Sequence, residues 1–310
     1  MSPTAGPKTP ERSADVACAS GGWIRTARRP PGWSPPGPQP AGHSDRGDLW
    51  PRAGEDLCYL TGDFRIFQRT DGHRWSLDDL LTGWRALTWE PQRHPHRVLD
   101  LGCGIGSVLM MLAWKLEDAS VTGVEAQELS VGLARRSLAY NGLESRVRVH
   151  HGDIRDPSLG LTDGPFELIT GTPPYFQTSD GVVSTMPQKG PCRFEVRGGV
   201  EAYAQATARH LAPDGMFTVC EDARQATRVE ATLRAHRLAA VDRLDVVGRE
   251  GKEPLFSVFR CVRGEAPDNY AVETMTVRDR HGQWTPSFAA VREMMGLPPK
   301  ITAGDAGRRP

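Results

Sequence analysis

Apolar residues in the middle of the chain form short runs that alternate with longer stretches of helical spacing. The short runs have the length and composition of buried strands, and they span 97–101, 119–124, 147–150, 166–170 and 215–220. The helical stretches span 108–116, 127–140, 200–211 and 288–295. Residues 244–247 and 256–262 predict a closing antiparallel pair. Strands separated by helices imply right-handed crossovers, so we predict a mostly parallel sheet with helices on both faces.

The two ends of the chain lack this pattern. Residues 1–48 are rich in Pro, Gly, Ser and Arg and carry no periodic apolar positions. Such a segment cannot bury enough surface to offset the entropy lost on ordering. Its arginines suggest a transit peptide, but repeated prolines together with Glu11 and Asp15 disfavour a targeting helix. We therefore predict a disordered arm over 1–48, one domain over 49–297 and a disordered tail over 298–310.

Composition restricts the classes of partner. The chain has 38 basic and 38 acidic residues, which argues against a dedicated basic surface for nucleic acid and leaves room for a local patch. No apolar run is long enough to span a bilayer, so we expect no membrane segment. The six cysteines are scattered, without a CxxC pair or a His/Cys cluster. We expect reduced thiols, a cytoplasmic protein, and neither a structural metal nor a disulfide framework.

The first predicted strand runs into a glycine-rich turn that opens a helix. Residues 98–106 read VLDLGCGIG, which places Asp100 two positions before Gly102, with Gly104 and Gly106 following at alternate positions. Glycines allow positive φ and let a ligand approach bare backbone. A nicotinamide-binding loop is the competing interpretation, but that loop favours GxGxxG. Asp100 is placed to bond a cationic amino group, directly or through water.

The next two strands end in acidic residues. Glu125 ends the second strand, 25 residues beyond Asp100, at the usual spacing for an acid that binds ribose hydroxyls. Asp153 follows the third strand, where a carboxylate can accept a hydrogen bond from the amine of an adenine ring. A solvated acid at a strand end is the plain alternative for each residue. Together with the glycine turn, the three strand ends offer sites for the amino acid, ribose and base of an adenosyl ligand.

The fourth strand ends in a Thr-Pro-Pro-Tyr run, from Thr172 through Pro173 and Pro174 to Tyr175, with Phe176 next. Two prolines enforce an extended backbone and remove N–H donors, so their carbonyls remain available. The aromatic ring beside them offers a flat face to a planar substrate, as in proteins that stack a flipped base. An ordinary proline turn is the alternative.

These motifs together resemble the amino-methyltransferases of the class I fold, whose fourth motif is Asn/Asp-Pro-Pro-Tyr. The segment 68–81, QRTDGHRWSLDDLL, is similar to the upstream segment of the bacterial tRNA1(Val) adenine-37 N6-methyltransferase group. Phe194-Glu195, followed by Gly198-Gly199, also resembles that group. The resemblance covers roughly residues 60–262.

The resemblance implies a doubly wound, Rossmann-like class I methyltransferase sheet of seven strands, with helices on both faces. It implies S-adenosylmethionine as cofactor and tRNA as substrate, methylated on an adenine N6 amine. The residues that would hold the cofactor are Asp100, Gly102, Gly104, Gly106, Glu125 and Asp153, with Ser76 and Asp78 packed over it. The residues that would act on the acceptor are Thr172, Pro173, Pro174 and Tyr175.

One position departs from this pattern, because Thr172 stands where the group has Asn or Asp. In the group, that side chain and the first proline carbonyl each accept a hydrogen of the target amine. Thr172 offers a shorter hydroxyl that is also a donor, while the Pro173 carbonyl is kept. The alternatives are therefore a methyltransferase that acts on a protein amide or a small molecule, and a non-catalytic subunit that binds S-adenosylmethionine. Lys189, Arg193 and Arg197 could hold RNA phosphates or form an ordinary solvated loop.

Overall fold

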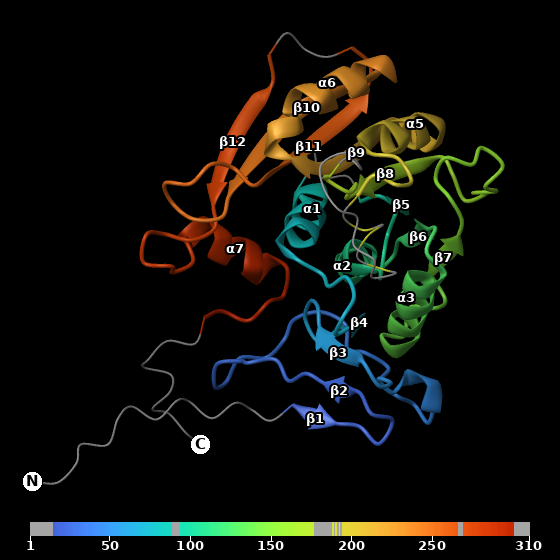
Figure 1. Cartoon of the computed structure of the whole chain (residues 1–310), viewed down its shortest axis with the longest axis vertical. Coiled ribbons are helices and arrows are strands. Elements are labelled where there is room, and N and C mark those ends of the chain that lie inside the picture. Colours follow the sequence, from blue (N-terminus) through green and yellow to red (C-terminus); the bar gives the residue numbers. More distant parts are fainter. Residues whose placement is uncertain are drawn as a thin grey trace, which may run out of the picture.

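The computed structural model describes residues 15–300, except 89–93, 177–187, 189, 191, 193 and 266–268. A central sheet dominates this part of the chain (Figure 1) and has eight strands in the order β12-β10-β11-β9-β8-β5-β6-β7. They are β5 (Arg97–Leu101), β6 (Ser120–Glu125), β7 (Val147–His151), β8 (Phe166–Gly171), β9 (Leu211–Asp222), β10 (Leu238–Val247), β11 (Phe256–Arg263) and β12 (Ala271–Thr276). Only β11 runs antiparallel to its neighbours within this sheet.

The expected strand count of seven is wrong by one, because β12 extends the sheet beyond β10. The doubly wound α/β class is confirmed, as is the antiparallel closing pair β10–β11. β12 lies at the edge of the sheet, and four of its six residues are exposed. A strand that shows most of its side chains to solvent has no apolar run from which it could be predicted.

Helices cover both faces of the sheet. One face carries α1 (Leu77–Leu87), α2 (Ser107–Lys115), α3 (Glu128–Tyr140) and α7 (Pro286–Met294), and the other carries α5 (Val200–His210) and α6 (Ala226–Ala235). Side chains alternate along β5, so Val98 packs into the first core, whereas Leu99 and Leu101 pack into the second. The four predicted helices are confirmed with small shifts of their ends.

The prediction of a disordered arm over 1–48 is wrong for residues 15–48, and 1–14 lie outside the described residues. β1 (Val16–Ala17) and β2 (Trp23–Ile24) join β3 (Glu55–Tyr59) and β4 (Arg65–Arg69) in a four-stranded sheet. It lies at the lower end of the molecule in Figure 1, against α3. Ion pairs hold the arm: the Arg25 guanidinium lies 2.8 Å from the Asp15 carboxylate and 2.7 Å from the buried Asp56. A segment held by backbone hydrogen bonds and ion pairs needs no periodic apolar residues, so the hydrophobic pattern does not reveal that it folds.

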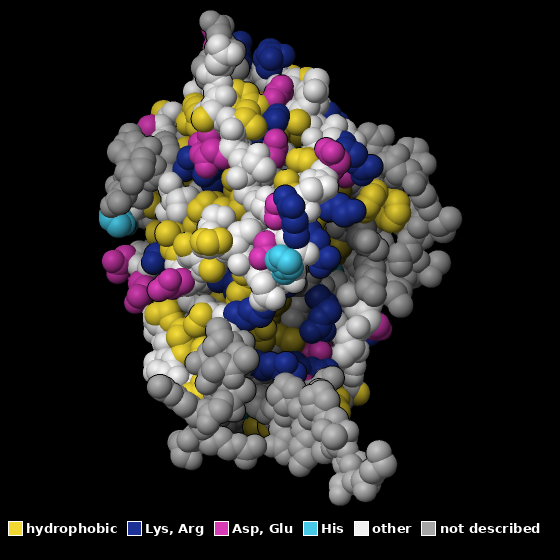
Figure 2. Space-filling model, turned by 90° about the vertical axis from the view of Figure 1, so that its left-hand side faces the viewer, with side chains coloured by type: hydrophobic (Ala, Val, Ile, Leu, Met, Phe, Trp, Pro, Cys, Tyr) yellow, Lys and Arg dark blue, Asp and Glu magenta, His cyan; other side chains and the backbone are white. Residues whose placement is uncertain are grey.

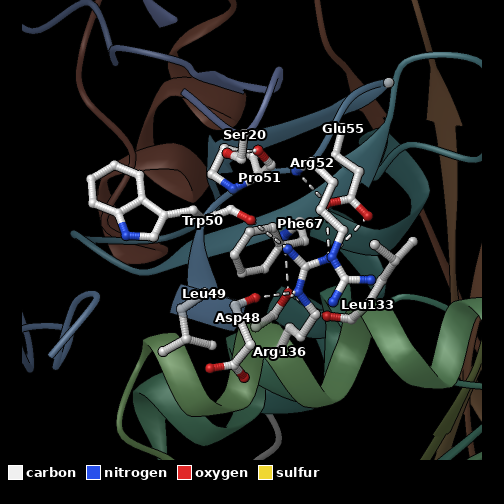
Figure 3. Close-up of polar contacts among 12 residues, drawn as sticks. Ser20, Asp48, Leu49, Trp50, Pro51, Arg52, Glu55, Phe67, Leu133 and Arg136 are labelled. Atoms are coloured by element: carbon white, nitrogen blue, oxygen red, sulfur yellow. Dashed lines mark hydrogen bonds and ion pairs between the residues drawn. The ribbon is translucent and has the colours of Figure 1, made fainter. Parts of the chain in front are cut away.

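Arg136 of α3 is the main polar anchor of this region (Figure 3). Its guanidinium donates to both oxygens of the Glu55 carboxylate, at 2.9 and 2.8 Å, and to the backbone carbonyls of Asp48 and Trp50. The same group lies over the ring of Phe67, 4.2 Å from its centroid. One partly exposed cation therefore connects the end of the arm, the small sheet and α3. Asp48 belongs to a short 3-10 helix, Gly47–Leu49.

The C-terminal segment after α7 packs beside the arm, around Trp114 of α2. Gly37 of the arm, Gly62 of the β3–β4 turn and Gly296 after α7 all lie so close to this indole that a Cβ on any of them would overlap it. The Gly62 N–H donates to the Gly296 carbonyl at 3.0 Å. Leu297 is buried, and residues 301–310 of the predicted tail lie outside the described residues.

The outer face formed by β12 and α7 carries basic and acidic side chains next to one another (Figure 2). Arg85 pairs with Glu273 at 2.9 Å, and Arg280 pairs with Glu250 at 2.8 Å. This face therefore does not present a single sign of charge. Among the described residues, no helix is both long and apolar enough to cross a membrane.

Candidate active site

A cavity of about 670 Å³ opens at the edge of the sheet where the parallel strands β5, β6, β7 and β8 end. Open α/β sheets bind ligands at this edge. Ten of the twelve predicted site residues line it: Ser76, Asp78, Gly102, Gly104, Glu125, Asp153, Thr172, Pro173, Pro174 and Tyr175. Asp100 and Gly106 are not part of the cavity wall. The structure thus brings together residues that lie up to 99 positions apart in the chain.

The turn after β5 needs glycine for two reasons. Gly102 has a φ of +61°, and a Cβ at this position would collide with the hydroxyl of Tyr203. Gly104 has a φ of +55° and faces open space, so its bare backbone is available to a ligand. Gly106 begins α2 as its N-cap, in the left-handed conformation.

Asp100 lies beneath this turn. It is 2% exposed, and its Oδ1 accepts a 2.7 Å hydrogen bond from the Thr170 hydroxyl. Its Oδ2 has no partner among the described residues. Burial raises the pKa of this carboxyl to about 7, partly offset by the Thr170 bond. Since Asp100 does not reach the cavity surface, its influence on a ligand passes through the glycine turn that covers it.

Glu125 closes the cavity at the end of β6. Its Oε2 accepts from the Gly104 N–H at 3.0 Å, and its Oε1 accepts from the Gln127 N–H at 2.6 Å. The carboxyl is largely buried, and this burial raises its pKa. Glu125 therefore both shapes the glycine turn and presents a carboxylate to the cavity.

Asp153 stands in the loop after β7, with its carboxylate already bonded. Both oxygens accept from Arg155, with Oδ2 lying 2.6 Å from the guanidinium. This bond is the main reason why the pKa of Asp153 is lowered. A ligand amine would share this carboxylate with Arg155.

Ser76 and Asp78 begin α1 at the opposite wall of the cavity. Ser76 is the N-cap, and its backbone N–H donates to the Asp79 carboxylate at 2.9 Å, as in a capping box. The Ser76 hydroxyl donates to Oδ1 of Asp78, and Oδ2 of Asp78 accepts a 2.9 Å hydrogen bond from the Tyr175 hydroxyl. The segment before α1 is thereby bonded to the Thr-Pro-Pro-Tyr run after β8.

The cavity also contains residues to which the sequence gave no role. Arg74 enters it before α1 and pairs with Asp56 at 3.1 Å. Tyr203 of α5 reaches the glycine turn across the sheet. Only the fold brings these two residues to the cavity. Arg197, named as a possible phosphate ligand, also lines the cavity, and it lies close enough to Glu125 to offset part of the rise in the pKa of that carboxyl. Lys189 and Arg193, named with it, lie outside the described residues.

Comparison with known proteins agrees with this geometry. A family model described as a methyltransferase domain matches residues 98–184, which include the glycine turn, Glu125 and the Thr-Pro-Pro-Tyr run. The chain is a class I S-adenosylmethionine-dependent methyltransferase. This methyltransferase is 27% identical to a tRNA1(Val) (adenine(37)-N6)-methyltransferase of Musicola paradisiaca over 222 residues, which cover 70% of this chain and 84% of the relative.

Two further matches bear on the methyltransferase. A ribosomal protein uL3 glutamine methyltransferase of Bradyrhizobium diazoefficiens is 32% identical over 141 residues, which cover 41% of this chain and 42% of that protein. A solved structure described as a predicted O-methyltransferase, Atu636 from Agrobacterium tumefaciens, has a TM-score of 0.54 and 18% identity. It covers 73% of this chain and 100% of that chain, and it supports the fold.

The cavity of the methyltransferase suits S-adenosylmethionine. Its volume falls within the range of small-molecule sites. The carboxylates in its wall, from Asp78, Asp79, Glu125, Asp153 and Asp222, outnumber its two arginines. An acidic wall favours a ligand with a sulfonium and an ammonium group. The single carboxylate of such a ligand would contact Arg197, or Arg74, which it would share with Asp56.

Proposed function

We propose that this methyltransferase transfers a methyl group to the N6 amine of an adenine in tRNA. The observation that carries the proposal is the position of the Thr172–Tyr175 run, which follows β8 and lines the same cavity as the glycine turn and Glu125. The name of the Musicola paradisiaca relative supports an adenine in tRNA as acceptor. A cytoplasmic location is part of this proposal.

In the proposed site, Glu125 binds the ribose of the cofactor, Asp153 its base, and Gly102, Gly104, Ser76 and Asp78 surround its amino acid end. S-adenosylmethionine supplies a methyl group on a positively charged sulfur, so the protein need not activate the electrophile. Catalysis then depends on holding the acceptor nitrogen in line with that methyl group. The Pro173 carbonyl and the Thr172 hydroxyl each accept one hydrogen of the amine, which directs the nitrogen lone pair toward the cofactor.

The proposal is tested with an unmodified tRNA(Val) transcript and isotopically labelled S-adenosylmethionine. We expect label in the RNA and N6-methyladenosine in its nuclease digest, identified by mass spectrometry. Absence of label from the transcript and from bulk tRNA would refute it. The similarity to a glutamine methyltransferase makes a protein amide the second candidate, and label in ribosomal protein would favour that acceptor.

Thr172 gives a second test of the acceptor. If the acceptor is an NH2 group, Thr172→Asn should preserve or raise turnover, because it restores a second carbonyl next to Pro173. Thr172→Val keeps the volume and removes the hydroxyl, so it should slow turnover by roughly tenfold or more. Single-turnover rates at saturating cofactor measure both effects. A valine variant at the parent rate, together with an inactive asparagine variant, would rule out an amine as acceptor.

A further inference from the structure

The hydroxyl of Tyr175 is fixed by side chains from two other elements. It donates to Oδ2 of Asp78 at 2.9 Å, and it lies 2.8 Å from the sulfur of Cys220 on β9. Its ring packs against the apolar core on the α1 side of the sheet. Cys220 is fully buried. Tyr175 therefore points its polar end into the protein and is anchored at both the ring and the hydroxyl.

Asp78, which receives this bond, is itself held in place. The Ser76 hydroxyl donates to its other oxygen, and Asp78 lies in the first turn of α1, where the helix dipole favours a negative charge. A hydrogen bond to a charged group of this kind is stronger than one between neutral groups. The chain Ser76–Asp78–Tyr175 thus connects the start of α1 rigidly to the loop after β8.

The next residue, Phe176, is arranged differently. Phe176 also lines the cavity, and its side chain carries no polar atom. Its backbone is held by a β-bridge to Phe194 and by the Glu195 N–H, which donates to its carbonyl at 2.9 Å. The rings of Phe176 and Phe194 lie 5.8 Å apart at a tilt of 41°. Contacts with Phe194 and Glu195 therefore hold this aromatic residue at the cavity.

We propose that Tyr175 is a positioning residue whose bond to Asp78 holds Thr172 and Pro173 against the acceptor, and that Phe176 supplies the ring on which a planar acceptor stacks. The proposal rests on the proposed function, because it assigns roles within the same site. Two prolines separate Thr172 from Tyr175, so the run is stiff and an anchor at one end fixes the other. Releasing the Tyr175 hydroxyl would let the Pro173 carbonyl move away from the line of methyl transfer.

Tyr175→Phe separates positioning from stacking, because it keeps the ring and removes only the hydroxyl. In single-turnover assays with an unmodified tRNA(Val) transcript and saturating cofactor, we expect the rate to fall about tenfold or more, with little change in the KM for tRNA. Phe176→Leu should instead raise the KM for tRNA. Tyr270→Phe is the matched control, since Tyr270 donates to the Glu230 carboxylate outside the cavity. A Tyr175→Phe variant with the parent rate would overturn the proposal.

A double-mutant cycle identifies the partner of the hydroxyl. We expect Asp78→Ala to slow transfer at saturating cofactor and Tyr175→Phe to add little to it, because both remove the same bond. If the double variant loses rate by the product of the two single losses, the assignment of Asp78 as the partner is overturned. If the parent protein transfers no methyl group to tRNA, the proposed function fails separately. The cycle is then measured on the unfolding midpoint of the full chain with S-adenosylhomocysteine, where additive shifts would overturn the Tyr175–Asp78 bond.

Discussion

Replacing Glu221 with glutamine should stabilise the protein at alkaline pH and change its stability little near pH 5. Glu221 lies in β9 with no exposed surface. Its Oε1 accepts from the Asp222 N–H at 2.9 Å, and its Oε2 has no partner in the described part of the chain. Burial raises its pKa to about 8, and the neighbouring carboxylates of Glu195 and Asp222 add to the rise, while Arg228 opposes it.

The sign of the effect follows from proton binding. The folded protein holds the Glu221 proton more tightly than the unfolded chain, where the pKa is near 4.5. The stability that this protonated group contributes is therefore fully present below pH 4.5. It is lost progressively as the pH rises from 4.5 to about 8, the folded pKa. The whole shift corresponds to about 4–5 kcal/mol. About 2 kcal/mol of that is already lost at pH 6, so about 2–3 kcal/mol remains to be lost between pH 6 and pH 9.

Urea unfolding of the parent protein and Glu221→Gln at pH 6 and pH 9 measures this loss directly. The advantage of the variant should grow by about 2–3 kcal/mol between the two pH values. Glu273→Gln is the matched control, because its bond to Arg85 lowers the pKa of Glu273 and keeps that group ionised at both pH values. Its effect on stability should be the same at both. An advantage of Glu221→Gln that stays constant from pH 6 to pH 9 would refute the reasoning.

Three other changes test the site and the arm. Glu125→Ala should weaken binding of S-adenosylhomocysteine by about 1.5–3 kcal/mol, and unchanged affinity in calorimetry would remove Glu125 from the site. Deleting residues 1–48 should lower the free energy of unfolding by about 2 kcal/mol or more, because it leaves the buried Asp56 without Arg25; a shortened chain as stable as the parent would contradict this. Arg136→Met should cost about 3–5 kcal/mol in unfolding, and adding Glu55→Gln should recover part of it.

Most of the residues that line the cavity could be predicted from the sequence, because their signals are local. A glycine turn follows one strand and acidic residues follow the next two, and parallel strands bring their carboxyl ends to one edge. Each of those signals is readable within about ten residues. The direction of the Asp100 carboxylate was not readable, since it depends on Thr170, 70 positions away.

The features that the sequence did not reveal depend on distant contacts. The arm contains few periodic apolar residues, yet Arg25 reaches Asp56 and Gly37 reaches Trp114. The bond between Tyr175 and Asp78 spans 97 positions. The hydrophobic pattern of a short stretch of sequence indicates secondary-structure propensity and burial. It does not indicate which charged or hydroxyl group bonds to which distant partner.

The packing around Trp114 has a consequence for how this sequence can vary. Gly37, Gly62 and Gly296 come from three separate stretches, yet a Cβ at Gly62 or Gly296 would lie 2.7 Å from an atom of the same indole. A smaller ring at position 114 would not free these glycines, because all three have a positive φ. A Cβ at Gly62 would also lie 2.6 Å from the Pro36 carbonyl oxygen, and one at Gly296 would lie 2.9 Å from the Gly62 nitrogen. In a family alignment, glycine should therefore be kept at these three positions even where the ring at position 114 changes, although none of them lines the cavity and they lie far from one another in the sequence.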